Sequence, residues 1–218
     1  SYTYFTWRNT KQELQQYVEE LTQTEQKEFY RPNFWPNTPD INPFGLQFAN
    51  ESKHLQRYFL AATLSSSVGI YGPVFEYMVS TPMAAGKEEY LNSEKYEVYH
   101  WDWNHKNKLI MLITRLNFLR RAHESLQQTN NIIFCDTGSD SVMAYIKYND
   151  NFSDRTLMIV SLNDQFPIQT SVRIPIEKIG SNPLQLTDQI TGNTYWWDKE
   201  WNFVELKPEL PFHLFKIA

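Results

Sequence analysis

The sequence has 218 residues, 41% of them hydrophobic, and a formal net charge of −5, which fits one large globular domain or two small ones. No Lys/Arg cluster marks a nucleic-acid surface, and no apolar run approaches the ~18 residues of a membrane helix. We therefore expect neither a nucleic-acid partner nor a membrane span. The single cysteine, Cys135, excludes an intrachain disulfide and favours a cytoplasmic location. The chain opens at Ser1 without Met, which suggests a fragment.

The first half of the chain alternates predicted strands and helices. A capping box of Thr10 and Glu13 begins the first helix. Repeated β–α units favour parallel strands with crossover helices, so the fold class of this half is α/β. In chain order, we expect a buried strand over Ser1–Trp7, a helix from Thr10, a short strand running into a loop over Tyr30–Asp40, a helix over Glu51–Leu64, a strand over Val68–Tyr71, a polar loop over about 80–107 and a helix over Lys108–His123.

The second half has the pattern of an antiparallel β-domain. Short strands with alternating apolar residues are separated by turn residues such as those at Thr191-Gly192-Asn193, which is typical of a small sandwich. The boundary is placed near residue 125, giving predicted domains 1–125 and 126–218. The expected strands are Ile132–Thr137, Val142–Tyr148, Thr156–Leu162, Gln169–Ile176, Leu184–Ile190, Asn202–Leu206 and Phe212–Ile217.

Several motifs of common enzyme classes do not occur. The sequence has no G-x-G-x-x-G, no P-loop, no G-x-S-x-G and no H-E-x-x-H. His100, Asp102 and His105 stand close together, but two Trp separate them and no Cys accompanies them, so we predict no metal site. Three β–α units cannot close an eight-stranded barrel, so the first half is either an open α/β layer or the end of a barrel.

Two segments carry the strongest local signals. Asp40, in Asn37-Thr38-Pro39-Asp40, follows a predicted strand, where barrel enzymes hold catalytic groups, although Asn, Pro and Asp also simply form turns. The acidic run 88–97 contains Lys95, with Glu94 and Tyr96 beside it. This run is either a solvated loop with weak local ion pairs or a loop that folds over a polar ligand, with Lys95 meeting an anion.

These segments resemble a known family. SYTYFTWRNTK (1–11), RPNFWPNTPDI (31–41), LAATLSSSVGIYGPVFE (60–76), EEYLNSEKYE (88–97) and LNFLRRAHESL (116–126) occur in an order and spacing similar to bacterial maltosyltransferases of the α-amylase clan. The run from AYIKY (144–148) to PFHLF (211–215) resembles that family's β-sandwich. The resemblance implies the last three β–α units of a (β/α)8 barrel over 1–125 and an antiparallel β-sandwich over 126–218.

The resemblance also implies a reaction and a set of residues. The family transfers maltosyl units from α-maltose 1-phosphate to α-1,4-glucans with retention, through two carboxylates and a covalent intermediate. Asp40 matches a third carboxylate that stabilises the transition state, and Lys95 matches a substrate-binding position, with Glu94 and Tyr96 as weaker candidates. No metal and no other cofactor is implied. Where amylases place a sugar-contacting His this chain has Pro39, which agrees with the transferase branch.

The family's nucleophile and general acid lie before Ser1, so we expect this piece to be inactive alone. The full-length protein is expected to be a homodimer, and exposed strand edges give the piece a route to self-association. Two alternatives stay open. One is an α-glucan-binding module that uses Tyr195-Trp196-Trp197 and Trp201, rings that core packing also explains. The other is an α-amylase-type hydrolase, against which the NTPD and SEKY motifs argue.

Overall fold

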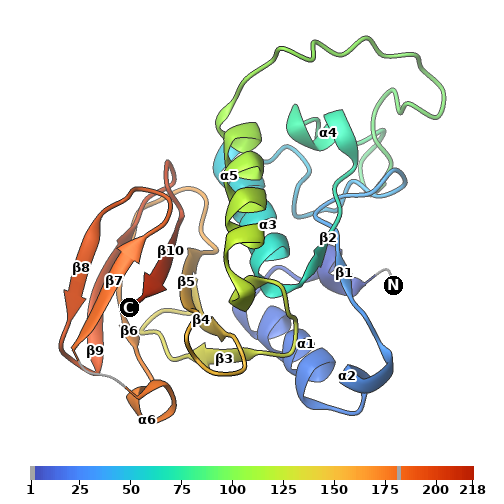
Figure 1. Cartoon of the computed structure of the whole chain (residues 1–218). Coiled ribbons are helices and arrows are strands. Elements are labelled where there is room, and N and C mark those ends of the chain that lie inside the picture. The colour runs from blue at the N-terminus through green and yellow to red at the C-terminus, as the bar shows by residue number, and fades with distance from the viewer. Residues whose placement is uncertain (1–2, 181–182) are drawn as a thin grey trace.

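The computed structural model describes residues 3–180 and 183–218, in the order of elements that Figure 1 shows. The first part contains η1 (Tyr4–Trp7), α1 (Lys11–Gln23), α2 (Gln26–Phe29), β1 (Asn33–Phe34), α3 (Glu51–Leu64), β2 (Ser67–Val68), α4 (Gly72–Glu76), α5 (Lys108–Ala122) and η2 (Glu124–Leu126). The second contains β3 (Ile132–Cys135), β4 (Val142–Tyr148), β5 (Arg155–Ser161), β6 (Ile168–Arg173), α6 (Ile176–Ile179), β7 (Leu184–Asp188), β8 (Thr194–Trp197), β9 (Trp201–Leu206) and β10 (Phe212–Ile217). The molecule is thus a mixture of helices and mainly antiparallel sheet.

The long helices begin at side-chain caps that the sequence contains. Thr10 accepts from the backbone N–H of Glu13, whose carboxylate accepts in return, so the predicted capping box is confirmed at α1. Asn50 and Asn107 accept from the third helical N–H in the same way and begin α3 and α5. The predicted helix over Glu51–Leu64 is therefore confirmed at both ends.

The expected strand over Ser1–Trp7 is wrong in its described part, since η1 occupies its second half; Ser1 and Tyr2 lie outside the described residues. The hydroxyls of Thr3 and Thr6 donate to the carbonyls of Asn33 and Trp35 at 3.0 and 2.7 Å. The segment therefore joins the chain around β1 through side chains instead of a backbone ladder. The expected parallel pairing appears between β1 and β2.

The second part forms two antiparallel sheets within the described residues. One has the strand order β3-β4-β5-β10-β7-β8, and the other pairs β6 with β9. The predicted strand over Gln169–Ile176 ends early, at Arg173, because Pro175 has no N–H for a ladder and α6 starts directly after it. Strand β8 was not predicted; it pairs with β7 at the edge of the larger sheet.

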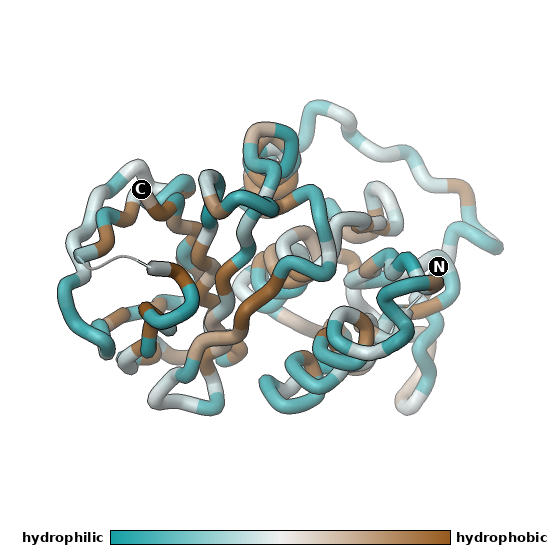
Figure 2. The backbone as a smooth tube through the Cα atoms, turned by 60° about the horizontal axis from the view of Figure 1, so that its bottom comes forward, coloured by the Kyte–Doolittle hydropathy of each residue, from teal (hydrophilic) through white to brown (hydrophobic). Residues whose placement is uncertain are grey.

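Two hydrophobic cores lie on the two faces of the larger sheet. One face packs on helices α3 and α5, where Phe59 stacks on Phe212 with ring centroids 4.3 Å apart. The other face meets β6 and β9. Hydropathy follows this layering, with hydrophobic residues along the central strands and hydrophilic ones over much of the periphery (Figure 2). No described helix is long and apolar enough to cross a membrane.

Candidate functional site

Asp40 stands at the tip of a tight turn that other groups hold in place. Thr38 and Ile41 exchange two backbone hydrogen bonds of 3.1 and 3.2 Å, and the Thr38 hydroxyl accepts from the backbone N–H of Asp40 at 3.3 Å. Asn37 is buried below the turn; it donates to the Tyr90 hydroxyl at 2.9 Å and accepts from the N–H of Tyr71 at 3.0 Å. The turn is therefore rigidly seated while the Asp40 side chain is 70% exposed.

The segment 88–97 lies against this turn. The N–H of Asn42 donates to the carbonyl of Glu88 at 2.6 Å, and the indole N–H of Trp7 donates to the Glu88 carboxylate at 2.8 Å. Asn92 adopts a left-handed backbone, with φ of 53°, which asparagine tolerates better than most residues. These contacts fold the segment back so that its second half reaches Asp40.

Lys95 and Asp40 meet directly. Lys95 Nζ lies 2.6 Å from a carboxylate oxygen of Asp40 and 3.4 Å from one of Glu89. The hydrogen bond to Asp40 raises the pKa of Lys95 above its ordinary value, so the ammonium stays protonated at neutral pH. The structure brings together two residues that the sequence analysis selected from separate motifs, and it adds Glu89 to them.

Glu94 and Tyr96 differ from Lys95 in their surroundings. One oxygen of Glu94 accepts from the Tyr71 hydroxyl at 2.6 Å and the other from the indole N–H of Trp101 at 2.8 Å. Tyr96 is 75% exposed. The roles of all four candidates in a reaction stay predictions.

A groove of about 370 Å³ opens beside the carboxylate of Asp40. It is lined by Trp7, Trp35, Thr38, Pro39, Asp40 and Ile41. Gly69 packs against the Trp35 ring so closely that a Cβ there would lie 2.4 Å from ring atoms, which fixes the indole beside the turn. Indole faces next to a carboxylate suit a sugar ring, whose C–H face stacks and whose hydroxyls donate. Trp7 and Trp35 were not selected from the sequence, because only their position in space connects them with Asp40.

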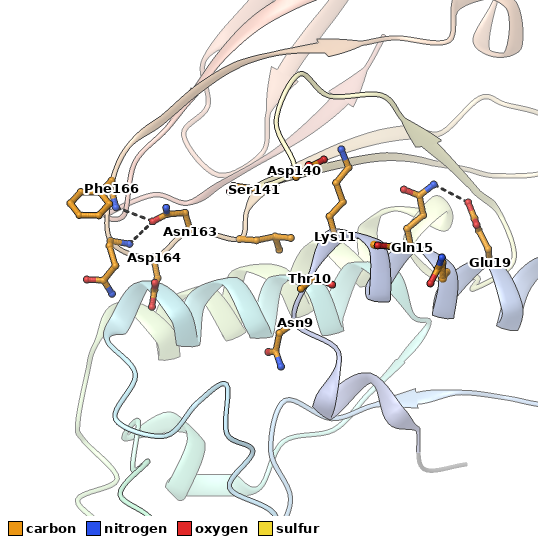
Figure 3. Close-up of a pocket in the computed structure, with 14 residues that line it drawn as sticks. Asn9, Thr10, Lys11, Gln15, Glu19, Asp140, Ser141, Asn163, Asp164 and Phe166 are labelled. Carbon is orange, nitrogen blue, oxygen red and sulfur yellow. Dashed lines mark hydrogen bonds between the residues drawn. The ribbon is translucent and has the colours of Figure 1, made fainter.

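A larger groove, of about 990 Å³, lies elsewhere, between the start of α1 and the loops after β3 and β5 (Figure 3). Most of its lining residues are polar. They include Gln15, whose amide donates to Glu19, and Asn163, whose side chain accepts from the N–H of Phe166. Despite its size we do not take it as the reaction site, since none of its lining residues belongs to the turn at Asp40 or to 88–97.

No group of three or more His, Cys, Asp or Glu able to hold a metal ion occurs within residues 3–180 and 183–218. Two of the three residues that could imitate such a site, His105 and Asp102, have other partners. His105 stacks on Tyr77 and contacts the amide of Asn107, and Asp102 accepts from the N–H of Asn104. The site chemistry available here is that of carboxylates, a lysine and indole rings.

Comparison with known proteins identifies similar sequences. A family model described as "GLGE, C-terminal" matches residues 134–217. The chain is 46% identical over its whole length to an alpha-1,4-glucan:maltose-1-phosphate maltosyltransferase of Methylacidiphilum infernorum, of which it covers 33%. It is 44% identical to the protein of the same name from Chlorobaculum tepidum, again over its whole length and over 34% of that protein. The chain thus spans about a third of the length of these relatives.

Solved structures with a similar fold are distant in sequence. AmyP in complex with maltotriose superposes with a TM-score of 0.72 and 16% identity, over 96% of this chain and 45% of that one. An Anoxybacillus alpha-amylase gives a TM-score of 0.69 at 11% identity, over 98% of this chain and 44% of that one. At this identity the likeness concerns the fold alone, which is that of part of an alpha-amylase-type enzyme.

Proposed function

Because the chain belongs to the family of alpha-1,4-glucan:maltose-1-phosphate maltosyltransferases, we propose that it forms the C-terminal part of a retaining glycosyltransferase. The whole protein transfers maltosyl units from α-maltose 1-phosphate to the non-reducing end of α-1,4-glucans, as in the synthesis of a glycogen-like polymer. Within the proposal, residues 1–125 are the last three β–α units of a (β/α)8 barrel and 126–218 an antiparallel β-sandwich. The parallel pair β1–β2 and the core shared by the two antiparallel sheets support these assignments.

The observation that carries the proposal is the contact of 2.6 Å between Asp40 and Lys95 beside a groove with two tryptophans. In a retaining transfer, positive charge develops at the anomeric carbon, and a fixed carboxylate stabilises it electrostatically. We assign that role to Asp40. Lys95 binds the substrate and neutralises the acidic surroundings formed by Asp40 and Glu89. The reaction needs no metal in this scheme.

The nucleophile and the general acid of this reaction are assigned to segments of the whole protein outside these 218 residues. We therefore propose that the 218 residues alone do not catalyse transfer. A cytoplasmic location and a homodimeric full-length protein belong to the same proposal; the single cysteine is compatible with the former.

The test is phosphate release from α-maltose 1-phosphate with a maltooligosaccharide acceptor, measured with the full-length product of the gene and with this chain. We expect release by the full-length protein only, and a loss of about 10²–10³-fold in kcat on Asp40→Asn. Glu97→Gln, which changes an exposed carboxylate of the neighbouring segment 88–97, is the matched control and should retain activity. Absence of release by the wild-type full-length protein, or full activity of Asp40→Asn, would overturn the proposal.

A second candidate function, α-glucan binding, is favoured by one observation. Trp201 and Phe203 stand two residues apart on the exposed face of β9, 45% and 64% exposed. The cluster expected at Tyr195-Trp196-Trp197 does not form one surface, since Trp197 is buried and, like Tyr195, packs against Phe215. Glucan affinity that is lost on Phe203→Ala and retained on Asp40→Asn would favour this function.

A further inference from the structure

The carboxylate of Glu94 is held from two directions. Tyr71 is the residue directly before α4, and its hydroxyl donates to one oxygen of Glu94 at 2.6 Å. Trp101 lies in the segment that leads to α5, and its indole N–H donates to the other oxygen at 2.8 Å. Hydrogen bonds to a charged acceptor are shorter and stronger than neutral ones. Burial, with the hydrogen bond to Glu94, raises the pKa of Tyr71, so its hydroxyl remains a donor throughout the neutral range.

A row of four rings in contact, two pairs stacked and the middle pair tilted, holds the Trp101 end of this arrangement. The ring centroids of Tyr99 and Trp101 are 5.2 Å apart, those of Trp101 and Tyr77 4.8 Å, and those of Tyr77 and His105 4.4 Å. The Tyr77 hydroxyl also donates to the carbonyl of Asp102. The irregular segment is thereby attached to the end of α4, although it has no regular secondary structure of its own between Tyr96 and Asn107.

The space around Glu94 is filled. The hollow that it lines with Tyr71 and Trp101 has a volume of about 10 Å³, which is no more than a single water would need. A sugar ring does not fit there. The groove beside Asp40, by contrast, measures about 370 Å³. Glu94 therefore bonds to packed side chains, and the next residue, Lys95, contacts Asp40, which lines the groove.

We propose that Glu94 is a positioning residue instead of a substrate ligand: bonded to Tyr71 and Trp101, it sets the backbone from which Lys95 reaches Asp40. The inference rests on the proposed function, because it takes Asp40 and Lys95 as part of the site that binds α-maltose 1-phosphate. A lysine has four rotatable bonds and lies here on an irregular loop, so its ammonium needs a fixed backbone to keep one position. Removing either donor to Glu94 loosens that backbone without changing a charge.

The first arm of the test uses this chain and needs no reaction. Lysine amines are labelled by reductive ¹³C-methylation, the Lys95 signal is assigned with Lys95→Arg, and its titration is followed by NMR. We expect Tyr71→Phe and Trp101→Phe, which keep an aromatic ring and remove the donor, to lower the apparent pKa of Lys95 as contact with Asp40 is lost. Trp103→Phe, an exposed indole of the same segment, is the control and should leave the titration unchanged.

The second arm uses the full-length protein. Tyr71→Phe and Trp101→Phe should raise KM for α-maltose 1-phosphate about tenfold and change kcat less, because they displace a binding group and leave the reacting carboxylates in place. A merely structural role would lower the Tm without this split between KM and kcat.

The two arms separate the two ideas. An unchanged Lys95 titration in Tyr71→Phe and Trp101→Phe overturns the positioning role whatever the kinetics. If the Lys95 titration changes in these variants but the wild-type full-length protein releases no phosphate, the positioning role of Glu94 is supported and α-maltose 1-phosphate is excluded as the glycosyl donor. A kinetic loss in Glu94→Gln that neither Phe variant reproduces, with normal Lys95 titration in both, would mean that Glu94 contacts substrate directly.

Discussion

The six-stranded sheet and the loops that carry Asp40 and Lys95 hold their side chains in place by different means. In the sheet, backbone ladders fix each position, and β4 pairs with β5 along seven residues. In the loops, isolated backbone hydrogen bonds, such as those between Thr38 and Ile41, are joined by side-chain bonds from distant parts of the chain: Trp7 bonds Glu88, and Asn37 bonds Tyr90. A ladder tolerates a changed side chain, whereas a loop with few backbone bonds depends more on each side-chain donor. We therefore expect single substitutions in the loops to change function more than substitutions in the sheet do, and to change the unfolding free energy less.

The largest effect on stability is expected where the helices meet the sheet. Phe59 of α3 stacks on Phe212 of β10, and both rings are fully buried. Phe59→Ala removes this contact and leaves a cavity, at a cost of about 3–5 kcal/mol of unfolding free energy. Urea unfolding followed by circular dichroism measures the loss, and Phe203→Ala, an exposed ring, should change little. A loss below about 1 kcal/mol would mean that helices and sheet unfold independently.

An intermediate effect is expected from a buried cation of the sheet. Lys147 on β4 is fully buried and donates to the carbonyl of Gln128; burial, with a smaller contribution from Arg120, lowers its pKa from 10.5 to about 7. Between pH 7 and 10.5 the unfolded chain therefore binds more protons at this lysine than the folded chain does, so its contribution to the unfolding free energy increases with pH across that range.

Lys147→Met should remove this pH dependence and stabilise the protein at pH 6 by about 1–3 kcal/mol, since an apolar side chain replaces a desolvated charge. Unfolding free energies measured at pH 6 and pH 9 test this. The exposed lysine Lys199, changed to Met, should preserve the wild-type slope. A wild-type stability that falls from pH 7 to 9 through this residue would contradict the expected sign.

The smallest effect on stability is expected at the site itself. Asp40→Asn breaks the ion pair with Lys95, but the Asp40 side chain is largely exposed and the turn is held by Thr38 and Ile41. Exposed pairs contribute little to folding, so the urea midpoint should not change measurably, while the transfer proposed for the full-length protein should slow about 10²–10³-fold. A clear fall of the urea midpoint would show that the ion pair between Asp40 and Lys95 stabilises the fold. The expected difference in stability effects between loops and sheet would then be wrong.

The difference between the regions also explains what the sequence predicts. Helix α3 and strand β4 were predicted with the observed ends, because apolar residues at helical spacing from Leu55 and an apolar run from Val142 are local signals. The strand expected over Ser1–Trp7 is wrong in its described part, since the Thr3 and Thr6 hydroxyls, and not the backbone, bond the segment around β1.

At the site, motif resemblance selects Asp40 and Lys95, yet nothing local indicates that they touch. Glu89, Tyr71 and Trp101 were missed for the same reason, because the bonds that connect them with the two candidates join turns and loops whose paths follow no periodicity. Sequence patterns predict elements, and the geometry between irregular segments requires the structure.

Cys135, the one cysteine of the chain, lies buried at the end of the edge strand β3, and burial raises the pKa of its thiol to about 12. A thiol that is neither accessible nor ionised is inert towards disulfide reagents until the strand opens. Its labelling rate in native buffer therefore counts the openings of this sheet edge, with no mutation and no attached probe. Cys135 is thus a built-in reporter of local opening at this edge of the sheet, and its labelling rate does not depend on motions of the loops around Asp40.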